Sequence, residues 1–268
     1  MNNFGFIVNE TANEYHARSR SGEFMSSHLL ADFRKSPALY RKKILGQVEE
    51  VDSPAFALGR AAHSLVLEGR NAFDQDFVVA DGPTNPKTGE AFGKTTKAYT
   101  QWLCDQDREV ISGKNYGFII KLQSSVLLHS AALELLVGGC AEGVVRAEYC
   151  GVPCQIRMDW YSSKFGLVDF KTCDELQWFE ADARRFGYVY QLAFYRSIIK
   201  IATGLDVPVH IIAVEKKEPF STGVWLITPE VLDMADYTNK AALERYKGCC
   251  HSGAWPTGFE EVRLIDTV

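Results

Sequence analysis

The sequence contains no long hydrophobic run. No stretch of about 18 uncharged apolar residues, the length that a membrane-spanning helix needs, occurs in the chain. The first residues, MNNFGFIVNETANEYH, also lack the basic, then apolar, then small-residue order of a secretory signal. We therefore expect a protein without membrane spans that works in the cytoplasm.

Cysteine is too sparse and too unevenly spaced for a disulfide framework. The count is seven, and an odd number in a chain without a secretory signal indicates reduced thiols. Cys150 and Cys154, with three cysteines further on, leave a zinc or iron–sulfur site as an alternative. However, the adjacent pair Cys249 and Cys250 lacks the C-x2-C spacing that such sites use. We favour inert thiols.

Several chemical signatures are absent as well. The sequence has no G-x-S-x-G motif and no glycine-rich phosphate loop, which disfavours a serine-hydrolase mechanism and ATP-driven action. An excess of positive charge is also lacking, because 34 acidic residues outnumber 29 lysines and arginines and give a formal net charge of −5. Nucleic acid is not excluded as a partner, since basic side chains can line a cleft in an acidic protein.

The residues that are present are those of a folded globular protein. Hydrophobic residues make up 46% and charged residues 24% of the 268 positions. At this length roughly three quarters of the unfolded chain's surface can be buried. The chain is therefore long enough for a sizeable core and an enclosed cleft.

The hydrophobic periodicity changes along the chain, from helical spacing to short runs of strand character. The predicted helices cover 26–45 with an interruption near Pro37, 54–68, 98–107, 117–130, 178–202 and 229–246. The predicted strands cover 77–80, 144–149, 155–161, 166–170, 207–215 and 223–227, and 81–97 reads as a surface loop. The three middle strands form an antiparallel meander. This order indicates an α/β fold, with a mixed sheet flanked by helices, in a single domain over 1–268.

Two aspartates and a lysine come together at the ends of two predicted strands. Asp159 ends one strand and Asp169 ends the next, after a tight hairpin, so the two carboxylates converge. Asp169 and Lys171 are two residues apart and share a face of their strand. Two carboxylates with a main-chain carbonyl, here that of Phe170, form a hard oxygen site for Mg²⁺ or Mn²⁺. An adjacent ammonium then suits metal-assisted hydrolysis of a phosphodiester.

A simpler interpretation of the same three residues is that they have no catalytic role. The aspartates would then merely border a turn, and Lys171 would be a solvated strand end. Such spacings often arise by chance. The residues around them decide between the two.

Five separated stretches resemble, in order, the motifs of one nuclease family. They are LGRAAH at 58–63, CQIRMD at 154–159, DFKT at 169–172, YQLAFY at 190–195 and VEKKEP at 214–219. On these stretches the chain is similar to RecE-type exonucleases of the PD-(D/E)xK superfamily, such as the nuclease domain of exonuclease VIII, and more distantly to lambda exonuclease. One departure is Met158, which stands where the superfamily name has a proline.

The resemblance implies a fold and a set of roles. The fold is a restriction-endonuclease-like α/β core, with the catalytic part over 140–230 and the mostly helical residues 1–130 as one wall of the cleft. Asp159 and Asp169 would bind metal. Lys171 would lie near the attacking water or the scissile phosphate.

Further site residues come from the same resemblance. His63 would be an additional metal-site residue, and Gln191 and Tyr195, one helical turn apart, would face the cleft and the DNA backbone. An upstream glutamate is also implied, for which Glu142 and Glu148 are the candidates, and we favour Glu142. Outside the resemblance, a single helical histidine and a Gln–Tyr pair would be assigned to hydrogen bonding and packing.

Basic side chains are candidates for contacts with DNA phosphates. Arg157 and Thr172 belong to the matched stretches. The basic residues of the N-terminal helices and of the long loop are Arg34, Lys35, Arg41, Lys42, Lys43, Lys87, Lys94 and Lys97. Among these we select Lys42, Lys43 and Lys94 as DNA-binding candidates. A solvated helix face is the alternative.

The resemblance implies a Mg²⁺-dependent exonuclease, with Mn²⁺ as a substitute, that degrades linear double-stranded DNA from 5′ to 3′. The product would be 3′ single-stranded DNA for recombination. A homo-oligomeric ring, a trimer or tetramer, and a single-strand annealing protein of the RecT type would be its partners. The alternatives are a nuclease-fold protein that binds DNA or a partner without cutting, a Cas4- or AddB-like nuclease of other polarity, and a phosphoesterase for small substrates.

Overall fold

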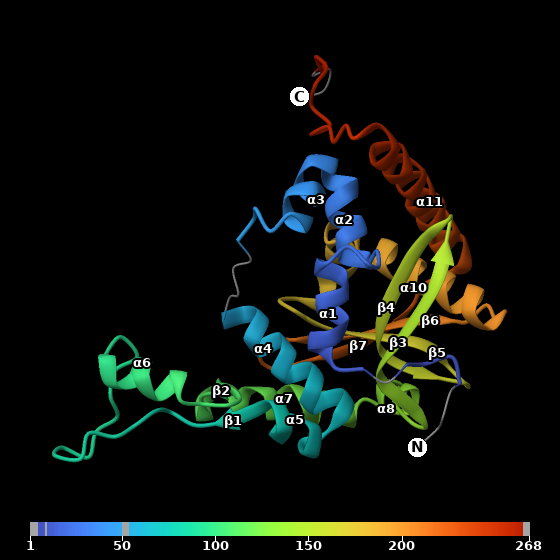
Figure 1. The fold of residues 1–268 in the computed structure, drawn as a ribbon. Coiled ribbons are helices and arrows are strands. Elements are labelled where there is room, and N and C mark those ends of the chain that lie inside the picture. Colours follow the sequence, from blue (N-terminus) through green and yellow to red (C-terminus); the bar gives the residue numbers. More distant parts are fainter. Residues whose placement is uncertain (1–4, 9, 50–53, 265–268) are drawn as a thin grey trace.

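A computed structural model describes residues 5–8, 10–49 and 54–264. Its centre is a five-stranded sheet of order β3-β4-β5-β6-β7 (Figure 1). Only β5 and β6 are parallel, and the other neighbours are antiparallel. The predicted mixed sheet and its antiparallel meander are therefore confirmed. The strands are β3 (Gly139–Tyr149), β4 (Val152–Ser162), β5 (Gly166–Cys173), β6 (Val209–Glu215) and β7 (Thr222–Leu226).

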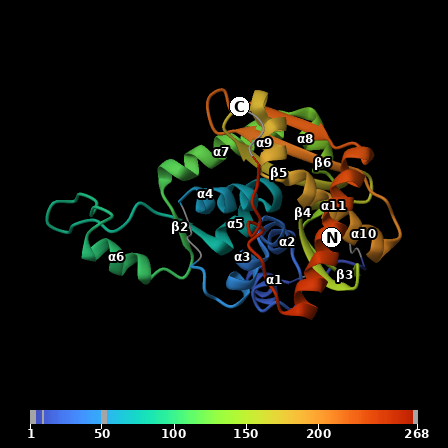
Figure 2. The same ribbon diagram turned by 90° about the horizontal axis from the view of Figure 1, so that it is seen from above.

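Helices cover both faces of this sheet (Figures 1 and 2). On one face a hydrophobic core forms with α10 (Tyr188–Thr203), α2 (Ser27–Lys35) and α11 (Pro229–Ser252). On the other face a second core forms with α4 (Pro54–His63), η1 (Ser64–Glu68), α5 (Arg70–Asp76), α7 (Gly113–Leu128) and α8 (Ser130–Leu135). No helix in the described part of the chain is both long and apolar enough to cross a membrane.

A small arm projects from this body (Figures 1 and 2). It contains a parallel pair of short strands, β1 (Phe77–Val79) and β2 (Glu109–Ile111), and the helix α6 (Lys97–Cys104). The predicted surface loop over 81–97 lies between β1 and α6. The arm therefore carries Lys94 away from the sheet.

Serine caps explain where the N-terminal helices begin. The Ser26 hydroxyl accepts from the Leu29 amide and caps α2, and the Ser36 hydroxyl accepts from the Leu39 amide and caps α3 (Pro37–Ile44). Pro37 occupies the first turn of α3, where its missing N–H costs nothing. The predicted interruption near Pro37 is thus confirmed, and Ser36 is both the end of one helix and the cap of the next.

Two predicted helices differ from the structure. The helix predicted over 178–202 is divided into η2 (Leu176–Trp178), α9 (Phe179–Arg185) and α10, because Gly187 adopts a left-handed conformation with φ 75°. The helix predicted over 54–68 changes to a π-helical turn after His63. Sequence patterns also missed β2, α8 and α1 (Ala12–Arg20). Only two residues of α1 are buried, so it has little hydrophobic periodicity, and a capping box formed by Thr11 and Glu14 marks its start.

One glycine sets how β5 lies against β6. Gly166 has φ +73°, and a Cβ there would approach the Pro208 carbonyl oxygen to 2.3 Å. The next amide, of Leu167, donates to that same oxygen at 3.0 Å. The contact begins the parallel register in which Asp169 lies beside Ile211. Only glycine satisfies both the backbone conformation and the close approach.

We expect Gly166→Ala to be more destabilising than Gly204→Ala. Gly204 has φ +75° with nothing within 4 Å of its hypothetical Cβ, so alanine there costs only the left-handed strain of about 1–2 kcal/mol. At Gly166 the fixed backbone oxygen adds overpacking of about 1–3 kcal/mol. Urea unfolding followed by tryptophan fluorescence measures both free energies. Equal losses would mean that the Pro208 contact relaxes without cost.

Candidate active site

The pairing of β4 with β5 stops after three residue pairs, the last being Trp160 with Val168. One position further along, the Asp159 carboxylate accepts a hydrogen bond from the Phe170 amide at 2.8 Å. A side chain therefore replaces the next backbone bond of the ladder. This substitution holds the Asp159 carboxylate between the two strands.

Asp169 and Lys171 form a buried ion pair on β5. Lys171 Nζ lies 2.6 Å from one Asp169 oxygen and 4.0 Å from the Asp159 carboxylate. Burial lowers the pKa of Lys171, but the two carboxylates raise it further, so the net shift is upward and the ammonium stays charged. Burial also raises the pKa of Asp169 to about 6, against the opposing effect of Lys171.

A second group of ligand atoms lies beside this pair. His63, Glu142 and Asp159 each offer one atom, and these atoms all lie within 4.8 Å of one another. His63 Nδ1 is 3.5 Å from the Asp159 carboxylate. Burial and the nearby Lys171 ammonium lower the pKa of His63 to about 4, so the imidazole is neutral and keeps a lone pair for a metal.

A break in the β3–β4 ladder positions Glu142. Ala141 pairs with Trp160 and Gly143 with Met158, but the intervening Glu142 and Asp159 are unpaired and Glu142 has φ 56°. A positive φ at a residue with a side chain is uncommon and marks a position held by its surroundings. The two carboxylates face one another where the ladder is interrupted.

The structure distinguishes the two candidate glutamates by position. Glu142 joins the ligand group, whereas Glu148 is exposed near the far end of β3, opposite Pro153. Burial and the Asp159 charge raise the pKa of Glu142 to about 8, although the Arg157 guanidinium, 2.9 Å away, opposes that rise. The Arg157 side chain, a predicted DNA contact, is therefore engaged with a carboxylate of the site.

The residues present fit a hard divalent cation. Two carboxylates and one neutral imidazole converge, and the Asp169 carboxylate lies beside them on β5. Apart from the Lys171 ammonium at 2.6 Å, neither buried oxygen of Asp169 has a hydrogen-bond partner among the described residues. Asp169 is only 1% exposed, and a buried carboxylate without such bonds is costly unless a cation or ammonium balances it. The Phe170 carbonyl, the predicted fifth ligand, lies 3.5 Å from Lys171 Nζ.

Two residues of α10, which the family resemblance selects, lie one helical turn apart near the carboxylates of the site. The Gln191 amide donates to the Tyr195 hydroxyl at 3.2 Å. Burial raises the pKa of Tyr195 to about 12, and the carboxylates of Asp159 and Asp169 add to the rise. The hydroxyl therefore stays protonated and remains a hydrogen-bond donor. Tyr188, which the sequence analysis did not select, places its ring 5.2 Å from Lys171 Nζ.

Sequence reasoning missed two further titratable neighbours. His28, in the first turn of α2, is solvent-accessible, yet its pKa is lowered by burial and by the charge of Lys171. Burial raises the pKa of Glu68, the last residue of η1, although the positive charge of Arg157 opposes the rise. Ser26, which caps α2, is a residue type typical of helix starts, and it is the sequence signal that places His28 in a first turn. No sequence signal marks Glu68.

The other predicted DNA contacts lie outside the ligand group. Lys43 is paired with Asp32 at 2.6 Å, and Lys42 is exposed on α3. Lys94 is in the projecting arm, and Thr172 follows Lys171 on β5 and so points to the opposite face. Their contacts with DNA stay predictions.

The cysteines do not form a metal site with these residues. All seven are free thiols, as expected. Burial raises the pKa of Cys154 to about 12 and that of Cys173 to about 11, so both stay protonated at neutral pH. Neither is in the state that metals prefer.

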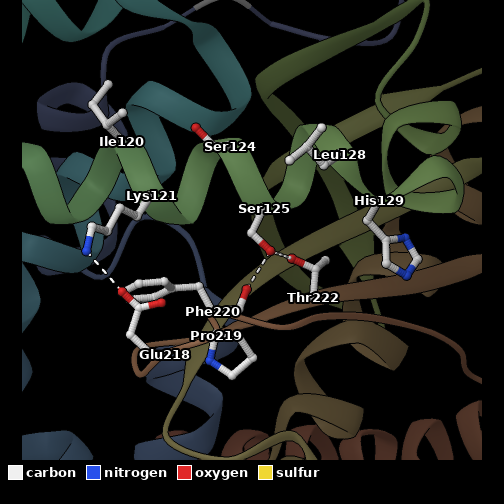
Figure 3. Close-up of a pocket in the computed structure, with 10 residues that line it drawn as sticks. All are labelled: Ile120, Lys121, Ser124, Ser125, Leu128, His129, Glu218, Pro219, Phe220 and Thr222. Atoms are coloured by element: carbon white, nitrogen blue, oxygen red, sulfur yellow. Dashed lines mark hydrogen bonds and ion pairs between the residues drawn. The ribbon is translucent and has the colours of Figure 1, made fainter.

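A separate pocket of about 540 Å³ lies between α7 and the turn that joins β6 to β7 (Figure 3). Several of its residues are joined to one another: Lys121 pairs with Glu218 at 3.0 Å, and the Ser125 hydroxyl contacts the Phe220 carbonyl and the Thr222 hydroxyl. None of the proposed metal ligands lines this pocket, so it is separate from the candidate active site.

Comparison with known families agrees with this geometry. A family model described as "PDDEXK-like domain of unknown function (DUF3799)" matches residues 26–267. The chain belongs to this family. The predicted restriction-endonuclease-like fold and the PD-(D/E)xK assignment are thereby confirmed.

One solved structure and the curated proteins complete the comparison. A crystal structure described as a "Putative exonuclease" from Eubacterium rectale superposes with a TM-score of 0.69 over 97% of both chains, at 18% sequence identity. At that identity the similarity concerns the fold. None of the curated protein sequences compared with the chain matches it.

We expect Asp159→Asn to weaken the binding of Mn²⁺ at least about tenfold, because the carboxylate charge is lost. The amide oxygen of asparagine still accepts from the Phe170 amide, so the fold is retained. Electron paramagnetic resonance of free Mn²⁺ measures the affinity directly. The control is Asp174→Asn, which alters an exposed aspartate paired with Lys216. Equal affinities in the two variants would contradict the site.

Binding of Mn²⁺ should also strengthen as the pH rises from 6 to 8. Below its pKa of about 8, Glu142 holds a proton that the metal must displace, so affinity falls as pH falls. One displaced proton corresponds to about tenfold per pH unit. In Glu142→Gln this dependence should flatten while weaker binding remains. A wild-type affinity independent of pH would show that Glu142 is ionised before the metal binds.

Proposed function

We propose that the protein is a metal-dependent nuclease that hydrolyses phosphodiester bonds in DNA. The observation that carries the proposal is the buried Asp169–Lys171 pair beside the His63–Glu142–Asp159 group, in a chain of the PDDEXK-like family. Carboxylates, a neutral imidazole and a charged lysine meet at one point of the sheet. This set of groups serves phosphodiester hydrolysis better than any other reaction that the sequence left open.

Each side chain has a task that its environment supports. His63, Glu142, Asp159 and Asp169 would hold the metal. A bound divalent cation supplies charge neutralisation at the phosphate and a more acidic water. Lys171 keeps its charge and can hold the attacking water or a phosphate oxygen by a charge-assisted hydrogen bond.

The residues of α10 would orient the substrate. Tyr195 keeps its proton and receives a hydrogen bond from Gln191, which fixes the direction of the hydroxyl. A fixed donor costs no reorganisation when charge develops on the phosphate. Tyr188 covers Lys171 and limits the directions from which water approaches it.

The finer assignment rests on the resemblance. We propose that the substrate is linear double-stranded DNA, that Mg²⁺ is the metal, and that degradation runs from 5′ to 3′ and leaves 3′ single strands for recombination. The description of the Eubacterium rectale protein as an exonuclease supports an end-dependent reaction. The ring-shaped oligomer and the RecT-type annealing partner belong to the same proposal.

The test is digestion of linear duplex DNA labelled at the 5′ end or at the 3′ end of one strand, in Mg²⁺ and in EDTA. We expect a Mg²⁺-dependent reaction that releases the 5′ label before the 3′ label. Asp169→Asn should reduce the rate at least about 10²-fold, because the isosteric amide removes the charge that balances Lys171 and the metal. Asp174→Asn serves as the control with the same chemical change at an exposed position.

A covalently closed circle separates the remaining outcomes. Resistance of the circle together with loss of the linear duplex establishes an exonuclease. Cutting of the circle would make the protein an endonuclease and contradict the RecE-type assignment. Binding of every DNA without cutting would favour the non-cleaving alternative, which the intact Asp159, Asp169 and Lys171 disfavour.

A further inference from the structure

A second pocket, of about 420 Å³, lies between the end of α2, the helix α11 and the C-terminal segment after it. Its lining carries four cationic side chains and one carboxylate, in a chain whose net charge is −5. The cations are Arg34, Lys35, Arg245 and Arg263. The pocket therefore concentrates positive charge on an acidic protein.

None of these four cations forms an ion pair with a carboxylate in the described part of the chain. The single carboxylate, Glu260, accepts from the amides of Thr257 and Gly258 and so is engaged with its own loop. Many other cations of this protein are paired. No carboxylate of the described residues therefore neutralises these cations, although Arg34 donates to Asn239 and Arg263 donates to the Gly258 carbonyl.

The walls of the pocket are built and held in place. The Arg34 guanidinium donates to the buried Asn239 and lies 4.4 Å from the Tyr190 ring centre. Trp255 stacks on Tyr40, and the Pro256 carbonyl accepts from the Ala38 amide, which ties the C-terminal segment to α3. Figures 1 and 2 show this segment passing over the N-terminal helices.

The pocket also has an aromatic edge. Phe259 is 69% exposed, and the Arg263 guanidinium lies 4.3 Å from its ring centre. An exposed ring beside cations is the combination by which proteins hold a nucleic-acid strand, with bases against the ring and phosphates against the charges.

Helices α2 and α10 connect this pocket with the catalytic residues. On α10, the Tyr188 ring faces the Lys171 ammonium, and the Tyr190 ring faces the Arg34 guanidinium. On α2, the pocket residues Arg34 and Lys35 belong to the last turn, and His28 belongs to the first turn, about 9 Å away along the helix axis.

We propose that this basic pocket binds backbone phosphates of the substrate strand beside the site at which the strand is cut. The inference rests on the proposed nuclease function and names the contact that holds the strand in register. Free phosphate and a nucleotide product share the same chemistry, so the experiment must separate them from a strand.

The experiment compares Lys35→Glu/Arg263→Glu with Lys247→Glu. Lys35 and Arg263 are exposed, so the double variant should fold, and circular dichroism checks this. Lys247, on the same helix as Arg245, pairs with Glu244 and lies toward the β3–β4 turn at Gly151. It is a charge-reversal control outside the pocket.

Fluorescence anisotropy in EDTA measures binding of an internally labelled duplex with a single-stranded end while cleavage is prevented. The double variant should bind at least about tenfold more weakly, with a salt slope lower by about 2, because each phosphate contact contributes about 0.9. Lys247→Glu should stay within about twofold of wild type. In Mg²⁺ the double variant should raise KM and leave kcat at saturating DNA unchanged.

Two results would overturn the inference. One is a double variant that binds DNA like Lys247→Glu. The other is a pocket that takes inorganic phosphate or a mononucleotide, lost in the double variant, while duplex binding is unaffected. Failure of the nuclease proposal looks different, because wild type itself would then neither bind nor cut DNA.

Discussion

The hydrogen bond from the Phe170 amide to the Asp159 carboxylate organises the whole site. It ends the β4–β5 ladder and turns a backbone donor toward a side chain. Asp159 is thereby held close to Lys171 on one side and to His63 and Glu142 on the other. Without this bond the two strands would be free to continue pairing, and the carboxylate would have no fixed place among its neighbours.

Electrostatic balance results from that arrangement. Lys171 is buried among carboxylates that keep it charged, and burial together with the Lys171 charge lowers the pKa of His63 and keeps it neutral. Burial next to Asp159 raises the pKa of Glu142 to about 8, and burial raises that of Asp169 to about 6. A divalent cation bound by these carboxylates would displace protons from them.

Local spacing accounts for the part of the site that could be predicted from the sequence. Strand alternation and a short hairpin are enough to bring Asp159, Asp169 and Lys171 together, whereas Gln191 and Tyr195 are selected by the family resemblance. The positive φ of Glu142 and the turn that begins at Ser64 depend on tertiary packing, which residue patterns do not encode. The basic pocket is further from prediction, because it joins both ends of the chain through Trp255 and Tyr40.

The π-helical turn after His63 acts as a spacer of one residue. The Gly69 amide donates to the Ser64 carbonyl, five residues back, at 3.0 Å, whereas an α-helix reaches back four. Deleting one residue from 64–68 would restore α-helical spacing and rotate the end of this turn and α5 by about 100° relative to His63. Glu68 would then leave the neighbourhood of Arg157. Length variation in this turn would therefore change the charge beside Arg157 while the residues His63, Glu142 and Asp159 stay the same.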